Sequence, residues 1–238
     1  MKILLRIAFV GTNYCGYQVQ PNGPSIQQRL NEATKELFGY DCDIVGCSRT
    51  DSGVHANEFF AAVTKKGESF PYTTQAIKVT GKLKVAPNEN EFFTDKKVKK
   101  MLTDLKYKEY VYLIWNGSIR DPFLNGRCWH CPKKIDSEGL ERMQKAASML
   151  VGKKDFSSFM AADSKIKDTV RTVYNASVEE HNGLLIFKVS ADGFLYNMVR
   201  IFMGTLIDVA YGRIDPDSMQ DIITACDRKM AGSTAPAE

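Results

Sequence analysis

Short apolar or alternating runs in this chain predict β-strands, separated by segments with helical periodicity. Strands are expected over residues 1–10, 44–45, 58–63, 108–115, 170–178 and 184–190. Apolar residues three and four apart predict helices over about 25–38, 137–151, 195–211 and 215–226. His181-Asn182-Gly183 lies between two of the strand-like runs, which is typical of a hairpin. Because hairpins pair strands antiparallel, the pattern favours an α+β fold over a doubly wound α/β fold.

Capping signals mark the ends of the first and last helices. Ser25 suits the N-cap of the first helix, with Gln28 completing a capping box and Gly39 ending the helix. Asp215 and Pro216 suit the N-cap and first position of the last helix. The residues expected to point inward from these two helices are Ile26, Leu30, Ala33, Leu37, Met219, Ile222, Ile223 and Cys226.

The helix expected over 195–211 carries two different faces. Its apolar stripe is made by Met198, Ile201, Phe202, Thr205 and Val209. A second face carries Asn197, Arg200, Gly204, Asp208 and Tyr211. Arg200 therefore projects beside a glycine, where another backbone or a ligand can approach closely. The alternative is an ordinary surface arginine.

Length and composition describe a globular chain of one large or two smaller domains. Its 238 residues are 44% hydrophobic and 25% charged. Each half repeats the order strand, helix, strands, so we expect α+β domains over residues 1–104 and 105–238. No apolar run reaches the ~18 residues of a membrane span, and the N-terminus lacks the features of a signal peptide. Six cysteines without a secretion signal indicate free thiols and a cytoplasmic protein.

A mild positive charge permits, but does not require, an RNA partner. The formal net charge is +4 and the pI is about 8.6. The lysines occur in pairs that could contact phosphates. These pairs are Lys65-Lys66, Lys96-Lys97, Lys99-Lys100, Lys133-Lys134 and Lys153-Lys154. For each pair the alternative is a solvated helix face or loop tip.

The run from Gly46 to Ala56 carries the strongest candidate for chemistry. It places one carboxylate, Asp51, in a short loop between two expected strands, two residues after Arg49. Loops held by a rigid sheet commonly carry catalytic groups. Gly53 allows positive φ or close approach to a ligand. The alternative is an Asx-turn in which the carboxylate only satisfies backbone N–H groups.

The sequence of this loop is similar to a family signature. SRTDSGVHA resembles the GRTDAGVHA element of the tRNA pseudouridine synthase A family, with Ser48 and Ser52 in place of Gly and Ala. The resemblance implies that Asp51 is the nucleophile. It also makes Arg49 the candidate to occupy the space left by a flipped nucleotide or to grip that nucleotide.

Two elements in the second half extend the resemblance. Residues 194–204 are similar to the family's F-x-x-x-M-V-R-x-x-x-G element, which implies that Arg200 pairs with the nucleophilic aspartate and keeps it ionised. Lys108 to Tyr112 resemble the family's K-x-Y-x-Y strand, which implies that Tyr110 packs against the target uracil. For Tyr110 the alternative is a core aromatic. Further matches are Gly16–Gln20, Ser25–Leu30, Asp155–Phe159, Thr169–Val173 and Asp227–Pro236.

The resemblance implies the pseudouridine synthase fold, with two ferredoxin-like halves and a central basic cleft. It also implies a homodimer that isomerises uridines 38–40 in the anticodon stem-loop of tRNA, with no metal or cofactor. Residues 83–105 lack the family's L-P-x-D-I and F-H-A-R elements, whose arginine falls at Leu102, and Lys96 to Lys100 could substitute. Family members also continue beyond Glu238 into a further strand.

The sequence is also compatible with other functions. They are a catalytically impaired RNA-binding relative, a pseudouridine synthase for another RNA, and an unrelated enzyme with an aspartate nucleophile. Cys128-Trp129-His130-Cys131 also raises a metal or redox site. A zinc site usually needs a second such pair, and Cys42 and Cys47 have the wrong spacing for one. A redox Cys-x-x-Cys belongs at a helix start in a βαβ unit, which the pattern does not predict here.

Overall fold

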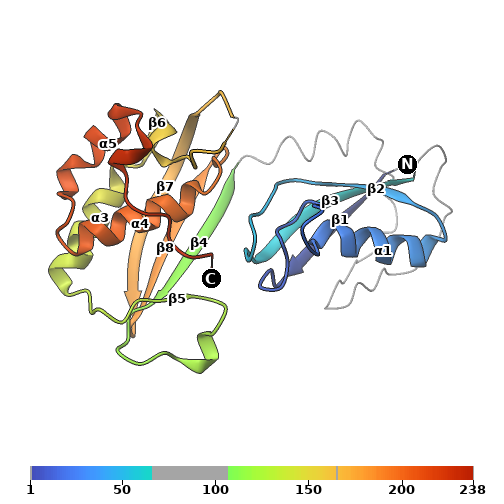
Figure 1. Ribbon diagram of the computed structural model, residues 1–238, viewed down its shortest axis with the longest axis horizontal. Coiled ribbons are helices and arrows are strands. Elements are labelled where there is room, and N and C mark those ends of the chain that lie inside the picture. Colours follow the sequence, from blue (N-terminus) through green and yellow to red (C-terminus); the bar gives the residue numbers. More distant parts are fainter. Residues whose placement is uncertain (1, 66–106, 165, 238) are drawn as a thin grey trace. The chain divides into compact units, whose positions relative to one another are not determined.

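The computed structural model describes residues 2–65, 107–164 and 166–237. Its contacts divide the chain into two compact units, residues 1–105 and 106–238. Each unit combines a mainly antiparallel sheet with helices, so the predicted α+β class is confirmed (Figure 1). The boundary expected near Asp104 lies outside the described residues, as do Lys66, Leu102 and the lysines from Lys96 to Lys100.

Within residues 2–65, the first unit consists of a three-stranded antiparallel sheet with one helix against it. Its elements are β1 (Lys2–Phe9), α1 (Ile26–Phe38), β2 (Cys42–Gly46) and β3 (Ala56–Lys65). The strand order is β1-β3-β2, so β3 lies in the centre. Alternate residues of the strands form the core with the inner face of α1: Leu5, Ile7, Ile26, Leu30, Ile44, Phe59, Ala61 and Val63.

Helix α1 begins and ends where the sequence predicts, but its buried face differs. The Ser25 hydroxyl accepts the Gln28 N–H, and Gly39 ends the helix with φ of 73°. The buried residues are Ile26, Leu30 and Thr34, whereas Leu37 is 39% exposed, so the prediction for Leu37 is wrong. Thr34 is tolerated inside because its hydroxyl donates to the Leu30 carbonyl at 2.8 Å.

The second unit is built on a five-stranded sheet of order β5-β4-β8-β7-β6. Its strands are β4 (Lys108–Trp115), β5 (Trp129–His130), β6 (Gly152–Asp155), β7 (Val170–His181) and β8 (Leu184–Ala191). Only the short β5 is parallel to its neighbour, β4. The predicted hairpin is confirmed between β7 and β8, with positive φ at Asn182 and Gly183.

The helices of the second unit lie over this sheet (Figure 1). They are α3 (Ser137–Ser148), α4 (Met198–Ala210) and α5 (Met219–Ala225), with 3-10 turns at Pro122–Leu124, Ser157–Phe159, Pro216–Ser218 and Arg228–Met230. Aromatic rings of Phe156, Phe159 and Phe202 meet edge to face in the core between them.

Helix α4 is buried nearly all round, which the two-faced pattern did not predict. Eleven of its thirteen residues are buried. The chain returns across the face that carries Gly204, where a Cβ would overlap the Ser233 carbonyl oxygen. The helix also begins later than expected, because Asn197 adopts a left-handed conformation with φ of 59°. The close approach of another backbone beside Gly204 is thus confirmed.

The last helix is shorter than predicted. Asp215 caps a 3-10 turn, and α5 starts only at Met219. Met219, Ile222 and Ile223 are buried as expected, but Cys226 is exposed. The reason is that Cys226 ends the helix in the left-handed region, with φ of 50°, and so leaves the helical spacing.

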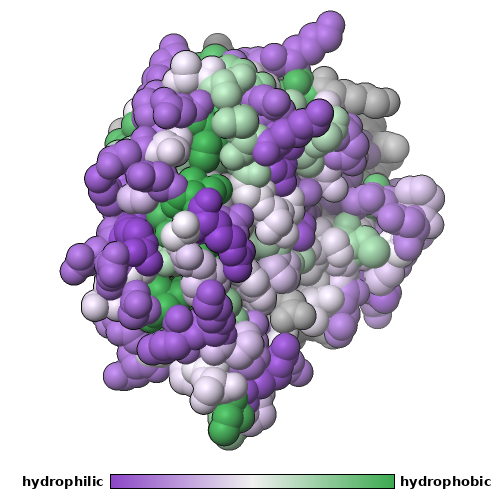
Figure 2. Space-filling model, turned by 60° about the vertical axis from the view of Figure 1, so that its left-hand side comes forward, coloured by the Kyte–Doolittle hydropathy of each residue, from purple (hydrophilic) through white to green (hydrophobic). Residues whose placement is uncertain are grey.

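Hydrophilic side chains cover most of the face shown in Figure 2, with hydrophobic ones in smaller patches between them. Such a mixture is ordinary for a folded surface. Within the described ranges, the chain contains no helix of the length and hydropathy that crossing a membrane requires.

Candidate active site

Asp51 lies in the loop between β2 and β3, as the sequence predicts. The loop starts where Cys47 donates its N–H to the Phe60 carbonyl at 2.8 Å. It returns to β3 through Gly53, whose φ is 81°, and the Val54 N–H donates to the Asp51 carbonyl at 3.3 Å. Asp51 is half-buried and Arg49 is exposed. Both flanking strands belong to one sheet, which makes the base of the loop rigid.

The segment before α1 holds this loop on both sides of Asp51. The Tyr17 N–H donates to the Thr50 carbonyl at 3.2 Å. The Gly53 N–H donates to the Tyr14 carbonyl, also at 3.2 Å. These two bonds tie the residue just before Asp51 and the residue two positions after it to one short stretch of chain, residues 14–17.

Gly16 makes this contact possible. Its φ is +84°, and a Cβ there would overlap the Thr50 carbonyl oxygen and lie 3.2 Å from the Asp51 carbonyl carbon. A side chain at this position would therefore push directly on the peptide that joins Thr50 to Asp51. Gly11 meets the other end of the loop in the same way, against the Val54 carbonyl.

The N-terminus of α1 anchors the same segment. The Gly16 carbonyl accepts the Ile26 N–H at 3.2 Å, and the Tyr17 carbonyl accepts the Gln27 N–H at 2.8 Å. Two orphan donors of the helix are thereby satisfied. The Tyr17 ring packs on Phe59, with centroids 4.5 Å apart, and burial raises the pKa of its phenol. The Asp51 loop thus rests on a helix terminus and a sheet.

Arg200 lies in the first turn of α4 and contacts the C-terminal segment. Its Nε donates to the Ala235 carbonyl at 2.7 Å, and its Nη1 donates to Asn197 Oδ1 at 2.9 Å. In return, the Ala235 N–H donates to the Arg200 carbonyl at 3.0 Å. The guanidinium is therefore oriented by its own unit.

A second arginine shapes the segment that Arg200 contacts. Arg228 Nη1 donates to the Gly232 carbonyl at 2.9 Å, and its Nη2 donates to Thr234 Oγ1 at 3.3 Å. The Gly232 N–H donates to Thr205 Oγ1 at 2.9 Å, which docks the segment on α4. Arg228 thus stabilises the conformation of the segment whose Ala235 carbonyl accepts a hydrogen bond from Arg200.

Tyr110 lies on β4, half-buried, in the same unit as Arg200. Its ring meets Phe194 edge to face, with centroids 5.0 Å apart and an interplanar angle of 83°. Tyr112, two residues along the same face, is buried and donates its hydroxyl to the Pro236 carbonyl at 2.6 Å. The two tyrosines therefore differ in role: Tyr112 is structural, and Tyr110 keeps a more exposed ring.

The Cys-x-x-Cys run and one of the lysine pairs, both candidates from the sequence, make contacts within the second unit. Cys131 Sγ lies 3.0 Å from the Tyr211 hydroxyl, and Cys128 Sγ lies 3.5 Å from the Leu124 carbonyl. Across the described residues, no three His, Cys, Asp or Glu side chains gather where they could hold a metal ion. Lys154 donates its ammonium to the Met149 carbonyl at the end of α3, and burial lowers its pKa.

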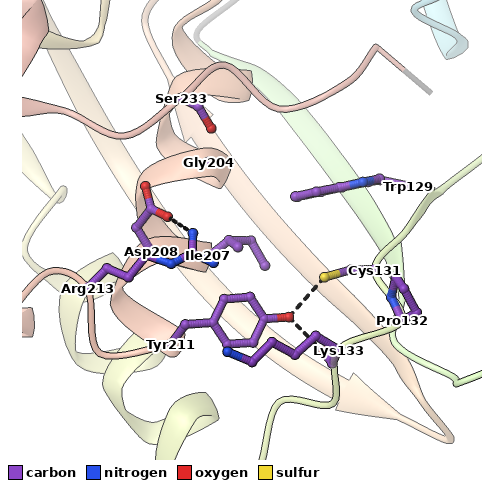
Figure 3. A pocket seen from close by; sticks show the side chains of 10 residues that line it. All are labelled: Trp129, Cys131, Pro132, Lys133, Gly204, Ile207, Asp208, Tyr211, Arg213 and Ser233. Carbon is purple, nitrogen blue, oxygen red and sulfur yellow. Dashed lines mark hydrogen bonds and ion pairs between the residues drawn. The ribbon is translucent and has the colours of Figure 1, made fainter.

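A pocket of about 320 Å³ opens beside α4 in the second unit (Figure 3). Gly204, Ile207 and Asp208 form its helical wall, Ser233 lies above, and Trp129 and Tyr211 face it from opposite sides. The sequence did not single out this pocket. In the sequence, Trp129 belongs to the Cys-x-x-Cys run and Tyr211 to a helical face, and neither pattern indicates a pocket.

The chain is similar to known proteins over nearly its whole length. A family model described as tRNA pseudouridine synthase matches residues 146–238. Proteins named tRNA pseudouridine synthase A match almost the whole chain. The Acetivibrio thermocellus protein is 38% identical over 241 residues, and the Thermoanaerobacter sp. protein is 35% identical over 241 residues, each covering 100% of this chain and 96% of the relative. The Pelobacter propionicus protein is 36% identical over 238 residues, covering 99% and 95%.

Similarity of this extent defines the class of the protein, an isomerase that forms pseudouridine in RNA. The chain belongs to the tRNA pseudouridine synthase A family. A solved structure titled "Crystal Structure of a Cbf5-Nop10-Gar1 Complex" covers 87% of this chain and 53% of its own, at 12% identity and a TM-score of 0.36. That likeness is too weak to add to the assignment.

The sequence missed the residues that support the site rather than form it. Gly16 and Tyr17 were matched to a family loop, but no role followed from the match. Arg228 was likewise matched without a role. Each of these residues lies in a short motif that the sequence shows, but its structural role depends on a contact that only the folded chain reveals.

Proposed function

We propose that this chain isomerises uridines 38–40 in the anticodon stem-loop of tRNA, with Asp51 as the nucleophile. The main support is the Asp51 loop, which has the family signature and is hydrogen-bonded to residues 14–17 on both sides of Asp51. A reacting carboxylate must be held within a fraction of an ångström of its productive position, and such a loop supplies that rigidity.

The reaction is a rearrangement that needs no net oxidation or reduction. The N1–C1′ bond breaks, the uracil turns, and a C5–C1′ bond forms. C5 loses its hydrogen as a proton and N1 gains a proton, so atoms balance. The carboxylate of Asp51 adds to the ring, attacks C1′ or removes a ribose proton; each route requires it to be ionised.

The other three predicted residues act on the base and on Asp51. Arg200 pairs with the nucleophilic carboxylate and favours its charged form. Tyr110 packs against the uracil with the accessible side of its half-buried ring. Arg49, exposed near Asp51, occupies the space that the uridine leaves when it flips or grips the flipped nucleotide. Flipping the base out of its stack costs a few kcal/mol.

The expected partners follow from the family. The substrate is the anticodon arm of tRNA, and the chain acts as a homodimer in the cytoplasm. The cysteines are all free thiols in the structure, which suits a reducing compartment.

Tritium release tests the proposal. Bulk tRNA labelled at C5 of uridine and lacking pseudouridine is incubated with the wild type, with Asp51→Ala and with Asp221→Asn. Asp221 is exposed on α5 and serves as a matched control carboxylate. We expect release by the wild type and the control but not by Asp51→Ala. Appreciable release by Asp51→Ala would overturn the nucleophile, and no release by the wild type would overturn the activity on tRNA.

A further inference from the structure

The pocket beside α4 has the components of a nucleotide site. Trp129 presents a half-buried indole to it, and Gly204 and Ile207 provide an apolar wall (Figure 3). Lys133 and Arg213 are exposed at its rim. A flat aromatic surface next to cations is the usual arrangement for binding one base and its phosphate.

The charges at the pocket favour a single negative charge on the occupant. Lys133 and Arg213 contribute two positive charges, and Asp208 contributes one negative charge, which leaves a surplus of one positive charge. Asp208 is paired with Arg213 and so holds that guanidinium in place. The surplus matches one phosphodiester group, which carries one negative charge.

The lower part of the pocket is fixed by Tyr211. Its hydroxyl donates to the Lys133 carbonyl at 2.6 Å, and the Cys131 thiol lies 3.0 Å from the Tyr211 hydroxyl oxygen. The Lys133 ammonium lies 4.3 Å from the centroid of the Tyr211 ring, and the Arg213 guanidinium lies 5.2 Å from it. Cation–π contacts of this kind hold both cations in place before a ligand arrives.

The position of the pocket connects it to Arg200. Gly204 and Asp208 follow Arg200 by one and two helical turns, at roughly 6 and 12 Å along α4. Ser233, above the pocket, belongs to the same segment that Arg200 and Arg228 hold. A chain whose uridine reacts near Arg200 would therefore reach this pocket with a neighbouring nucleotide.

We propose that this pocket binds one nucleotide of the RNA substrate outside the reacting uridine, with its base on Trp129 and its phosphate at Lys133 and Arg213. The inference rests on the proposed function, because it takes the RNA as the substrate. It adds a binding site that the reacting residues do not include.

Tryptophan fluorescence provides a direct readout. The chain contains two tryptophans, Trp115 and Trp129. In a Trp115→Phe, Asp51→Asn protein, Trp129 is the sole reporter and turnover is blocked. Titration with pseudouridine-free tRNA should quench its emission saturably, whereas UMP alone should do so only at far higher concentration.

Variants assign the effect to the pocket. Trp129→Leu keeps an apolar side chain without a π-face and should weaken RNA binding by about 5- to 150-fold, whereas Trp129→Phe should recover part of it. Lys133→Gln should lower the slope of log affinity against log salt by about 0.7–0.9. Lys134→Gln, the exposed neighbour that does not line the pocket, should leave both unchanged.

The outcomes separate this inference from the function on which it rests. Wild-type tritium release together with a quenched Trp129 and a Lys133 effect supports both. Release without quenching, or with Lys133→Gln equal to Lys134→Gln, overturns the pocket alone. Absence of release overturns the activity on tRNA, and quenching by RNA in that case still supports a nucleotide site.

Discussion

Replacing Gly16 by alanine tests whether the segment before α1 positions Asp51. Gly39 is the matched control, because it also has positive φ, +73° against +84°, but a Cβ at Gly39 meets nothing within 4 Å. Both substitutions impose an alanine on a left-handed backbone. Only Gly16→Ala also drives a methyl group into the Thr50 carbonyl oxygen.

The two variants should differ in magnitude and in kind. The left-handed conformation alone costs about 1–2 kcal/mol of unfolding free energy in each. Gly16→Ala further disturbs the Tyr17–Thr50 hydrogen bond, which adds roughly 0.5–1.5 kcal/mol. Relief of the overlap moves the Thr50–Asp51 peptide by on the order of 1 Å, and a misplacement of that size costs about 100-fold in kcat.

Urea unfolding and single-turnover tritium release measure the two effects separately. We expect Gly39→Ala to lose stability while it retains the wild-type rate. Gly16→Ala should lose rate about 100-fold with tRNA affinity nearly unchanged. If both variants fold and Gly16→Ala turns over as fast as Gly39→Ala, the segment does not position the nucleophile.

Three further predictions concern the second unit. Tyr112→Phe leaves the Pro236 carbonyl without its donor and should cost about 1 kcal/mol in urea unfolding; an unchanged midpoint would contradict the assigned bond. Ser158→Ala removes a buried hydroxyl that donates to the Ile222 carbonyl at 2.6 Å, and should cost about 1–3 kcal/mol with the rate per folded molecule unchanged. If Arg200 pairs with Asp51 as proposed, Arg200→Ala should cut the rate sharply and raise the pKa of Asp51, which moves the acidic limb of the pH–rate profile to higher pH; a profile that stays in place would refute the pairing.

Burial along the helices differs from the periodic pattern at a few positions, each for a local physical reason. Hydrophobic periodicity indicates which side of a helix is apolar, but not how many elements pack around it, and α4 is therefore more buried than its pattern predicts. Thr34 is buried although it is polar, because its hydroxyl is satisfied by the Leu30 carbonyl, whereas Leu37 is exposed. Cys226 was expected inside but lies outside, since a helix end breaks the spacing that the prediction assumes.

Local sequence patterns were sufficient to predict the class of fold, the approximate positions of strands and helices, and the loop that carries Asp51. Those features depend on local patterns: alternation, capping residues, glycine in turns, and a short signature. Tertiary structure decided what surrounds them. Residues 14–17 form hydrogen bonds to the Asp51 loop, and the chain after α5 returns over Gly204. Such contacts between distant segments depend on the paths of both segments, which no local pattern specifies. The pocket between Trp129 and Tyr211 has the same origin, since its walls come from elements about 80 residues apart and no local pattern encodes their meeting.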